Sequence, residues 1–271
     1  MAAARTVFLV AALALTCLGP APAASGQPAS NKIGVVVMHG KGGSPTRFVS
    51  DLAAGLEGRG FLVENLEMPW SARRNYDADV AAAEKQVGDA LDALRAKGAA
   101  KVFVAGHSQG GLFALHLGGR LMIDGVVAIA PGGNVGANVY QQKIGPALAE
   151  AKKYVAEGKG AERQRLLDFE GSRGVYPVAA VPLAYVAWFD PDGAMNEFRA
   201  LKQLWPKLPV LLVAPKRDYP GLRALKDRVF RALPQTPYTR LYEPDADHLH
   251  SPAASVDEIA RWTAQVANAG R

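Results

Sequence analysis

Residues 102–111 read VFVAGHSQGG, a short apolar run followed directly by a G-x-S-x-G pattern centred on Ser108. Glycine has no Cβ, so Gly106 and Gly110 allow a strand and a helix to pack closely around a strained turn. The apolar run predicts a buried strand, and residues 112–117 favour a helix whose N-terminus points at the serine. A serine at such a turn is accessible and becomes a nucleophile once a base takes its proton. The segment therefore predicts a nucleophile at Ser108.

Short apolar runs alternate with amphipathic stretches along most of the chain. Alternation of this kind is typical of a parallel sheet covered by helices on both faces. We therefore predict an α/β fold with a mostly parallel, doubly wound sheet of about six strands. The predicted strands are residues 33–38, 61–68, 101–105, 125–130, 209–214 and 238–242, and the predicted helices include residues 45–56, 77–97 and 256–267.

One long segment interrupts this alternation. Roughly 80 residues separate Ala130 from Val210, far more than a simple crossover needs. Within it, residues 147–154 and 160–169 resemble two polar helices. The segment leaves the carboxyl edge of the sheet, beside the serine, so we expect residues 134–205 to include a helical lid. An ordinary surface excursion without a role in the site is the alternative.

The N-terminus has the pattern of a secretory signal peptide. Arg5 precedes the apolar residues 6–18, and small residues at 21–23 suit cleavage near Ala23. About a dozen apolar residues are too few for a comfortable membrane span, so no stable membrane insertion is expected after cleavage. We predict a signal peptide over 1–23, a flexible leader over 24–32 and one domain over 33–271. The predicted location is the periplasm or the exterior.

Composition argues against several classes of function. The formal net charge of +6 falls to +5 without Arg5, and the basic residues are scattered, so nucleic-acid binding is not expected. The only cysteine, Cys17, lies in the predicted signal peptide, which excludes disulfides and cysteine-bound metal in the mature domain. The glycine-rich residues 40–44 lack the spacing of a phosphate-binding loop, and no metal-ligand spacing is present. We predict no cofactor and no metal.

A general base for Ser108 must come from one of five histidines. His248 follows the last predicted strand, on a loop at the carboxyl edge where loops converge on the serine. It is the predicted base, and His250 is the main alternative. His107 adjoins the serine, but its side chain is expected to point away around the turn. His116 is expected in core or surface, and His39 is expected to support the loop that follows its strand.

The base needs a carboxylate that orients it. Asp218 follows the next-to-last predicted strand at the same sheet edge, and it is the predicted acid. Alternatively, Asp218 is a turn residue or pairs with Arg217, without a role in catalysis. Asp190 and Asp192 are the alternative acids, because some enzymes take the acid from an earlier strand.

Acyl transfer also needs donors for the developing oxyanion. The backbone N–H of Gln109, the residue after the serine, is one predicted donor. The second is expected from the loop after the first strand, where the N–H of Lys41 is best placed and Gly42 is a close alternative.

Together these residues resemble the α/β-hydrolase fold family. Residues 39–43 match its His-Gly-x-Gly-Gly oxyanion motif, residues 106–110 match its nucleophile elbow, and Asp218 and His248 match its acid and histidine positions. The resemblance covers nearly the whole mature chain and implies the fold and a Ser-His-Asp triad. Only residues 24–32 precede the first strand after cleavage, which implies a sheet trimmed to six parallel strands, as in minimal secreted lipases and cutinase-like enzymes.

The resemblance leads to a predicted function. We expect a serine hydrolase that cleaves a small-molecule ester or acyl substrate through an acyl-enzyme. The alternatives are an amidase or acyltransferase with the same triad, and a catalytically silent binding protein on the same fold. Residues 176–189, with Trp188 and Trp205, line an apolar acyl pocket in one interpretation and are ordinary core in the other.

Overall fold

The computed structural model describes Met1 and residues 32–269. The predicted signal peptide and leader therefore lie, except for Met1 and Lys32, outside the described residues, and both stay predictions. In the part of the chain that the structure describes, no helix is long and apolar enough to cross a membrane.

The centre of the molecule is a sheet of six strands in the order β2-β1-β3-β4-β7-β8. All five neighbouring pairs are parallel, which confirms the predicted fold class. The central strands are continuous apolar runs because helices cover both of their faces. The strands are β1 (Lys32–Met38), β2 (Leu62–Leu66), β3 (Ala99–His107), β4 (Gly125–Ile129), β7 (Val210–Val213) and β8 (Arg240–Tyr242).

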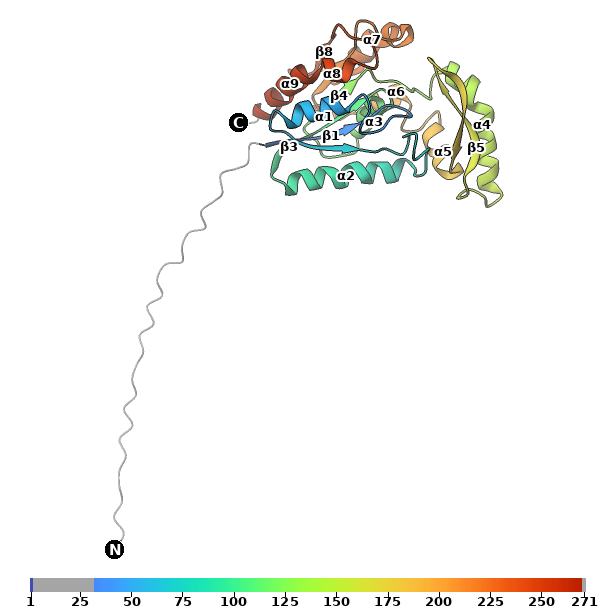
Figure 1. Ribbon diagram of the computed structural model, residues 1–271, viewed down its shortest axis with the longest axis horizontal. Coiled ribbons are helices and arrows are strands. Elements are labelled where there is room, and N and C mark those ends of the chain that lie inside the picture. Colours follow the sequence, from blue (N-terminus) through green and yellow to red (C-terminus); the bar gives the residue numbers. More distant parts are fainter. Residues whose placement is uncertain (2–31, 270–271) are drawn as a thin grey trace.

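Helices form a layer on each side of the sheet (Figure 1). Asp79 caps the longest helix of one layer by accepting a hydrogen bond from the Ala82 N–H at 2.8 Å. This helix buries Val87, Leu91 and Leu94 on one stripe against the sheet. That layer contains α2 (Val80–Ala96), α3 (Gln109–Leu117) and α7 (Pro220–Ala232), and the opposite layer contains α1 (Ser50–Glu57), α8 (Ser251–Ala254) and α9 (Val256–Asn268).

The long segment between β4 and β7 forms an insertion at one end of the molecule, where α4, α5 and β5 lie together (Figure 1). Its core is continuous with that of the body. Trp188 packs edge-on against Trp70 at 5.2 Å and tilted against Phe113 at 5.3 Å between ring centroids. The insertion contains α4 (Asn138–Ala156), β5 (Gln164–Glu170), β6 (Gly174–Ala180), α5 (Pro182–Phe189) and α6 (Glu197–Gln203).

Two sequence predictions of local structure are wrong. Residues 160–169 do not form a helix, because residues 164–170 are strand β5, paired antiparallel with β6. Burial alternates along β5, with Leu166 and Asp168 buried and Leu167 exposed, but the buried aspartate hides this alternation from a hydrophobicity pattern. Helix α1 begins at Ser50 rather than at residue 45, because Phe48 has a φ of +64°, which no right-handed helix accommodates.

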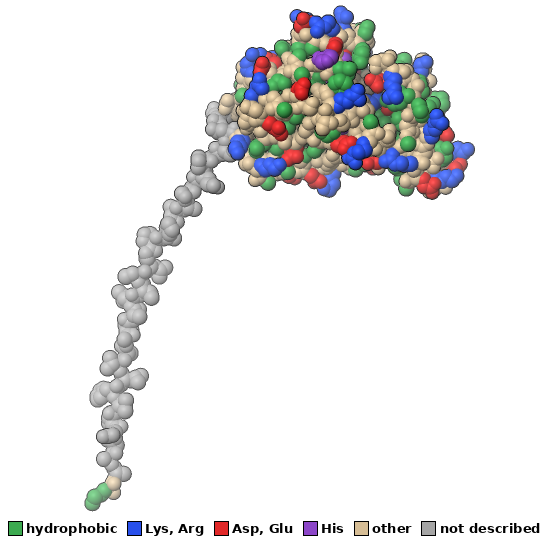
Figure 2. Space-filling model, in the orientation of Figure 1, with side chains coloured by type: hydrophobic (Ala, Val, Ile, Leu, Met, Phe, Trp, Pro, Cys, Tyr) green, Lys and Arg blue, Asp and Glu red, His purple; other side chains and the backbone are tan. Residues whose placement is uncertain are grey.

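The visible surface carries mixed charge. Lys and Arg side chains are interspersed with Asp and Glu over the face shown in Figure 2, without a continuous basic stripe on that face. This distribution agrees with the scattered charges of the sequence.

Candidate active site

Ser108 lies at the sharp turn between β3 and α3. Its φ of +54° and ψ of −117° fall outside the regions that ordinary residues prefer, and its N–H donates to the Ile129 carbonyl at 2.8 Å. A Cβ at Gly106 would lie 2.0 Å from the Gly110 oxygen, and one at Gly110 would lie 2.7 Å from the carbonyl oxygens at the end of β1. The two glycines therefore permit the turn that holds the Ser108 hydroxyl at the sheet edge.

His248 and Asp218 form a buried pair at the same edge. The imidazole Nδ1 lies 2.8 Å from the Asp218 Oδ1, and the two side chains are 8% and 4% exposed. The same carboxylate oxygen accepts the Tyr219 N–H at 2.7 Å, and the Tyr219 ring lies against the imidazole with centroids 4.6 Å apart. This contact orients the imidazole with Nδ1 facing the carboxylate and Nε2 on the opposite side of the ring.

His107 contacts the His248 loop, a role that the sequence did not reveal. Its Nε2–H donates to the His248 carbonyl oxygen at 2.9 Å, and the two rings lie 4.8 Å apart. Burial lowers the pKa of His107 to about 3, so this ring is neutral. The expectation that its side chain points away around the turn therefore needs correction, since the ring packs against the site.

Within residues 32–269, no hydrogen bond joins the Ser108 hydroxyl to the His248 ring. Bonds between nucleophile and base are often long before substrate binds, so this geometry does not argue against the pair.

The alternative site residues lie elsewhere. His250 is exposed and pairs with Asp247 at 2.8 Å, whereas His116 pairs with Glu84 at 2.6 Å. The Asp190 carboxylate accepts the Asp192 N–H at 3.0 Å at the end of α5, and in the described chain the His248 ring pairs with Asp218 instead.

The loop after β1 is anchored beside Ser108. The buried His39 accepts the Met68 N–H on Nε2 at 3.0 Å, and its carbonyl accepts the Trp70 indole N–H at 2.9 Å. Gly42, the alternative oxyanion donor, already donates its N–H to the Trp70 carbonyl at 2.9 Å. In the described part of the chain, the backbone N–H groups of Lys41 and Gln109 have no acceptor.

The family model described as "Alpha/beta hydrolase family" matches residues 35–262. The chain belongs to the alpha/beta hydrolase family.

The hydrolase is similar to esterase EstD of Thermotoga maritima, with 29% identity over 108 residues. That match covers 36% of this chain and 26% of EstD, so it spans about a quarter of that relative. The fold is similar to the monoacylglycerol lipase of Paleococcus ferrophilus, with a TM-score of 0.60, 20% identity and coverage of 86% and 94% of the two chains. It is also similar to Est1E of Butyrivibrio proteoclasticus with bound ferulic acid, with a TM-score of 0.55, 13% identity and coverage of 87% and 88% of the two chains. The structural likenesses show the fold.

A narrow cavity lies where the insertion of the hydrolase meets the two predicted oxyanion residues. It is too narrow to hold a water molecule, and its lining includes Lys41, Gln109, Tyr76, Tyr140, Trp188 and Phe189. Trp188 and Phe189 are buried core residues that also border this narrow cavity, and the acyl-pocket interpretation of residues 176–189 stays a prediction. Trp205 is half-buried against the core.

Sequence reasoning missed the side chains that the insertion contributes. Lys41 was predicted only for its backbone N–H, yet its ammonium group is buried against Asp168 of β5 at 2.6 Å. Tyr76 and Tyr140 contact the same carboxylate. The only signal in the sequence was Asp168 itself. It is a charged residue at a buried position of β5, a strand that the hydrophobic pattern did not reveal.

Residues 32–269 hold no group of three or more His, Cys, Asp or Glu side chains suited to a metal ion. That the hydrolase needs no metal or cofactor stays a prediction.

Proposed function

We propose that this hydrolase cleaves carboxylic esters through an acyl-enzyme on Ser108. The observation that carries the proposal is the buried pair of His248 and Asp218, 2.8 Å apart, at the sheet edge that also holds Ser108. This pair supplies a base with a defined tautomer, and the strained turn supplies an accessible hydroxyl.

The proposed reaction has two halves. His248 Nε2 takes the hydroxyl proton as Ser108 Oγ attacks the ester carbonyl, and the N–H groups of Lys41 and Gln109 stabilise the oxyanion. Collapse of the tetrahedral intermediate breaks the ester C–O bond, and the imidazolium protonates the leaving alcohol. A water then attacks the acyl-enzyme with His248 as base, and the acid leaves with Ser108 reprotonated.

The cavity supports esters with a short acyl group. In this structure the space between Lys41, Gln109 and four aromatic side chains is too narrow to hold even a water molecule, so a long acyl chain does not fit there unless these side chains move. The names of the relatives, an esterase and a monoacylglycerol lipase, support ester substrates as a class. We further propose that residues 1–23 direct export, so that the enzyme acts in the periplasm or outside the cell.

Hydrolysis of p-nitrophenyl esters tests this function. We expect kcat/KM to be highest for acetate or butyrate and to fall for the long laurate ester, because the long chain has no room in the cavity. Ser108→Ala, at unchanged circular dichroism, is expected to remove the activity. Equal turnover of all chain lengths would contradict the proposed acyl preference, and full activity of Ser108→Ala would contradict the proposed reaction.

A further inference from the structure

A buried carboxylate on the insertion collects five hydrogen bonds near the predicted oxyanion hole. Asp168 is fully buried and lies on β5, far from the nucleophile in sequence. Buried charges of this kind need full satisfaction. Its donors are the Lys41 ammonium at 2.6 Å, the hydroxyls of Tyr140 at 2.7 Å, Tyr76 at 2.9 Å and Tyr176 at 3.2 Å, and the Phe169 N–H at 2.6 Å.

The Lys41 side chain ends in this cluster. Besides Asp168, its ammonium donates to the Tyr140 hydroxyl at 2.7 Å and to the Phe169 carbonyl at 3.1 Å, and the side chain is 7% exposed. All three ammonium protons therefore have acceptors on the insertion. The insertion thus fixes the side chain of Lys41, whose backbone N–H is one predicted oxyanion donor.

The second predicted donor has a link to the same cluster. The Gln109 side chain is 3% exposed, and its oxygen lies 3.5 Å from the Tyr76 hydroxyl, which donates to Asp168. Burial and the neighbouring carboxylate raise the pKa of Tyr76 well above its usual value, so this hydroxyl keeps its proton. Asp168 therefore contacts Lys41 directly and reaches Gln109 through one tyrosine.

We propose that Asp168 is a positioning residue that aligns the Lys41 and Gln109 backbone N–H groups for the oxyanion. The inference rests on the proposed function, because it takes these two groups as the donors. An oxyanion donor acts only when it points at the place where charge develops, and loss of one donor lowers kcat by about 10²–10³. In this proposal the insertion contributes to the oxyanion site through Asp168.

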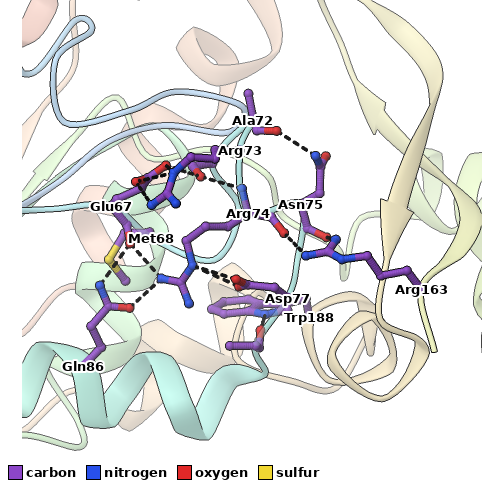
Figure 3. Close-up of polar contacts among 12 residues, drawn as sticks. Glu67, Met68, Ala72, Arg73, Arg74, Asn75, Asp77, Gln86, Arg163 and Trp188 are labelled. Atoms are coloured by element: carbon purple, nitrogen blue, oxygen red, sulfur yellow. Dashed lines mark hydrogen bonds and ion pairs between the residues drawn. The ribbon is translucent and has the colours of Figure 1, made fainter. Parts of the chain in front are cut away.

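Arg163 supplies a control for general docking of the insertion. Its guanidinium reaches across to the Arg74 carbonyl at 3.0 Å (Figure 3). It also donates to the Ala179 carbonyl at 2.6 Å. The Arg74 contact joins the insertion to the loop that carries Tyr76, and neither contact touches Lys41 or Gln109. Loss of Arg163 therefore weakens docking without removing the anchor of either predicted donor.

The test compares kcat, KM, thermal stability and end-point labelling by a fluorophosphonate in three variants. Asp168→Asn keeps the shape and removes the charge. The double variant Lys41→Met with Asp168→Asn removes both charges, so that no unpaired buried charge interferes with folding. Arg163→Ala is the control.

We expect Asp168→Asn and the double variant to lower kcat for p-nitrophenyl acetate roughly 10- to 100-fold, with KM within about twofold of wild type. Every molecule should still label at the end point, because Ser108 and His248 are intact. Arg163→Ala should lower the unfolding temperature and keep kcat within about twofold. Full kcat in the double variant, or an equal loss in Arg163→Ala, would overturn the inference. A wild-type protein that does not label at all would instead refute the proposed function on which it rests.

Discussion

At the scale of single residues, Glu197 is a buried acid that the proposed chemistry does not use. It is 3% exposed at the start of α6, and its side chain borders a small cavity that Asp218, Leu212 and Leu222 also line. Burial raises its pKa from 4.5 to about 7, and the charge of Arg228 offsets only part of that effect. Between pH 4.5 and 7, the folded protein therefore keeps a proton on Glu197 that the unfolded chain has released.

This shift predicts that Glu197→Gln raises the free energy of unfolding by an amount that depends on pH. Protonated Glu197 stabilises the fold fully below pH 4.5, and this contribution is lost as pH rises through about 7. At pH 8 the buried charge costs about 3 kcal/mol, so the glutamine variant should unfold at higher urea than wild type. At pH 4.5 the two should unfold alike. Glu57→Gln, an exposed position on α1, controls for the change of charge. The same gain at both pH values would argue against a titrating Glu197.

At the scale of elements, the contact between β1, β3 and α3 decides the geometry of the nucleophile. Gly110 lies in the first turn of α3, directly against the carbonyl oxygens of Met38 and His39. The G-x-S-x-G pattern made this contact predictable, because only a residue without Cβ fits there. Strand β5 was not predictable in the same way, because its buried face carries Asp168 where a hydrophobic residue was expected.

Two glycine-to-alanine changes separate this contact from helix propensity. In Gly110→Ala the new methyl group would lie 2.7 Å from two backbone oxygens, and we expect a loss of about 2 kcal/mol or more in the free energy of unfolding. In Gly88→Ala, within α2, nothing lies within 4 Å, and alanine is the better helix former, so we expect a gain of about 0.5–1 kcal/mol. Urea denaturation measures both. A neutral Gly110→Ala would contradict the close packing described for the turn.

At the scale of the whole molecule, the body and the insertion were predictable to different degrees. Alternating apolar runs indicated the six-stranded sheet, and parallel strands bring the loops after β3, β7 and β8 to one edge. That rule placed Ser108, Asp218 and His248 near one another from sequence alone, and the structure supplies the 2.8 Å contact between the last two. The contacts of Lys41 with Asp168 and Tyr140 were beyond prediction, because they join segments 127 and 99 residues apart without a shared periodicity.

Labelling with a fluorophosphonate tests most directly whether Ser108 is the nucleophile. The reagent is expected to modify wild-type protein once per chain, and peptide mass spectrometry should place the phosphonyl group on Ser108. Ser108→Ala should remain unlabelled while circular dichroism shows that it is folded. Labelling that survives this substitution, or a modified residue other than Ser108, would contradict the account.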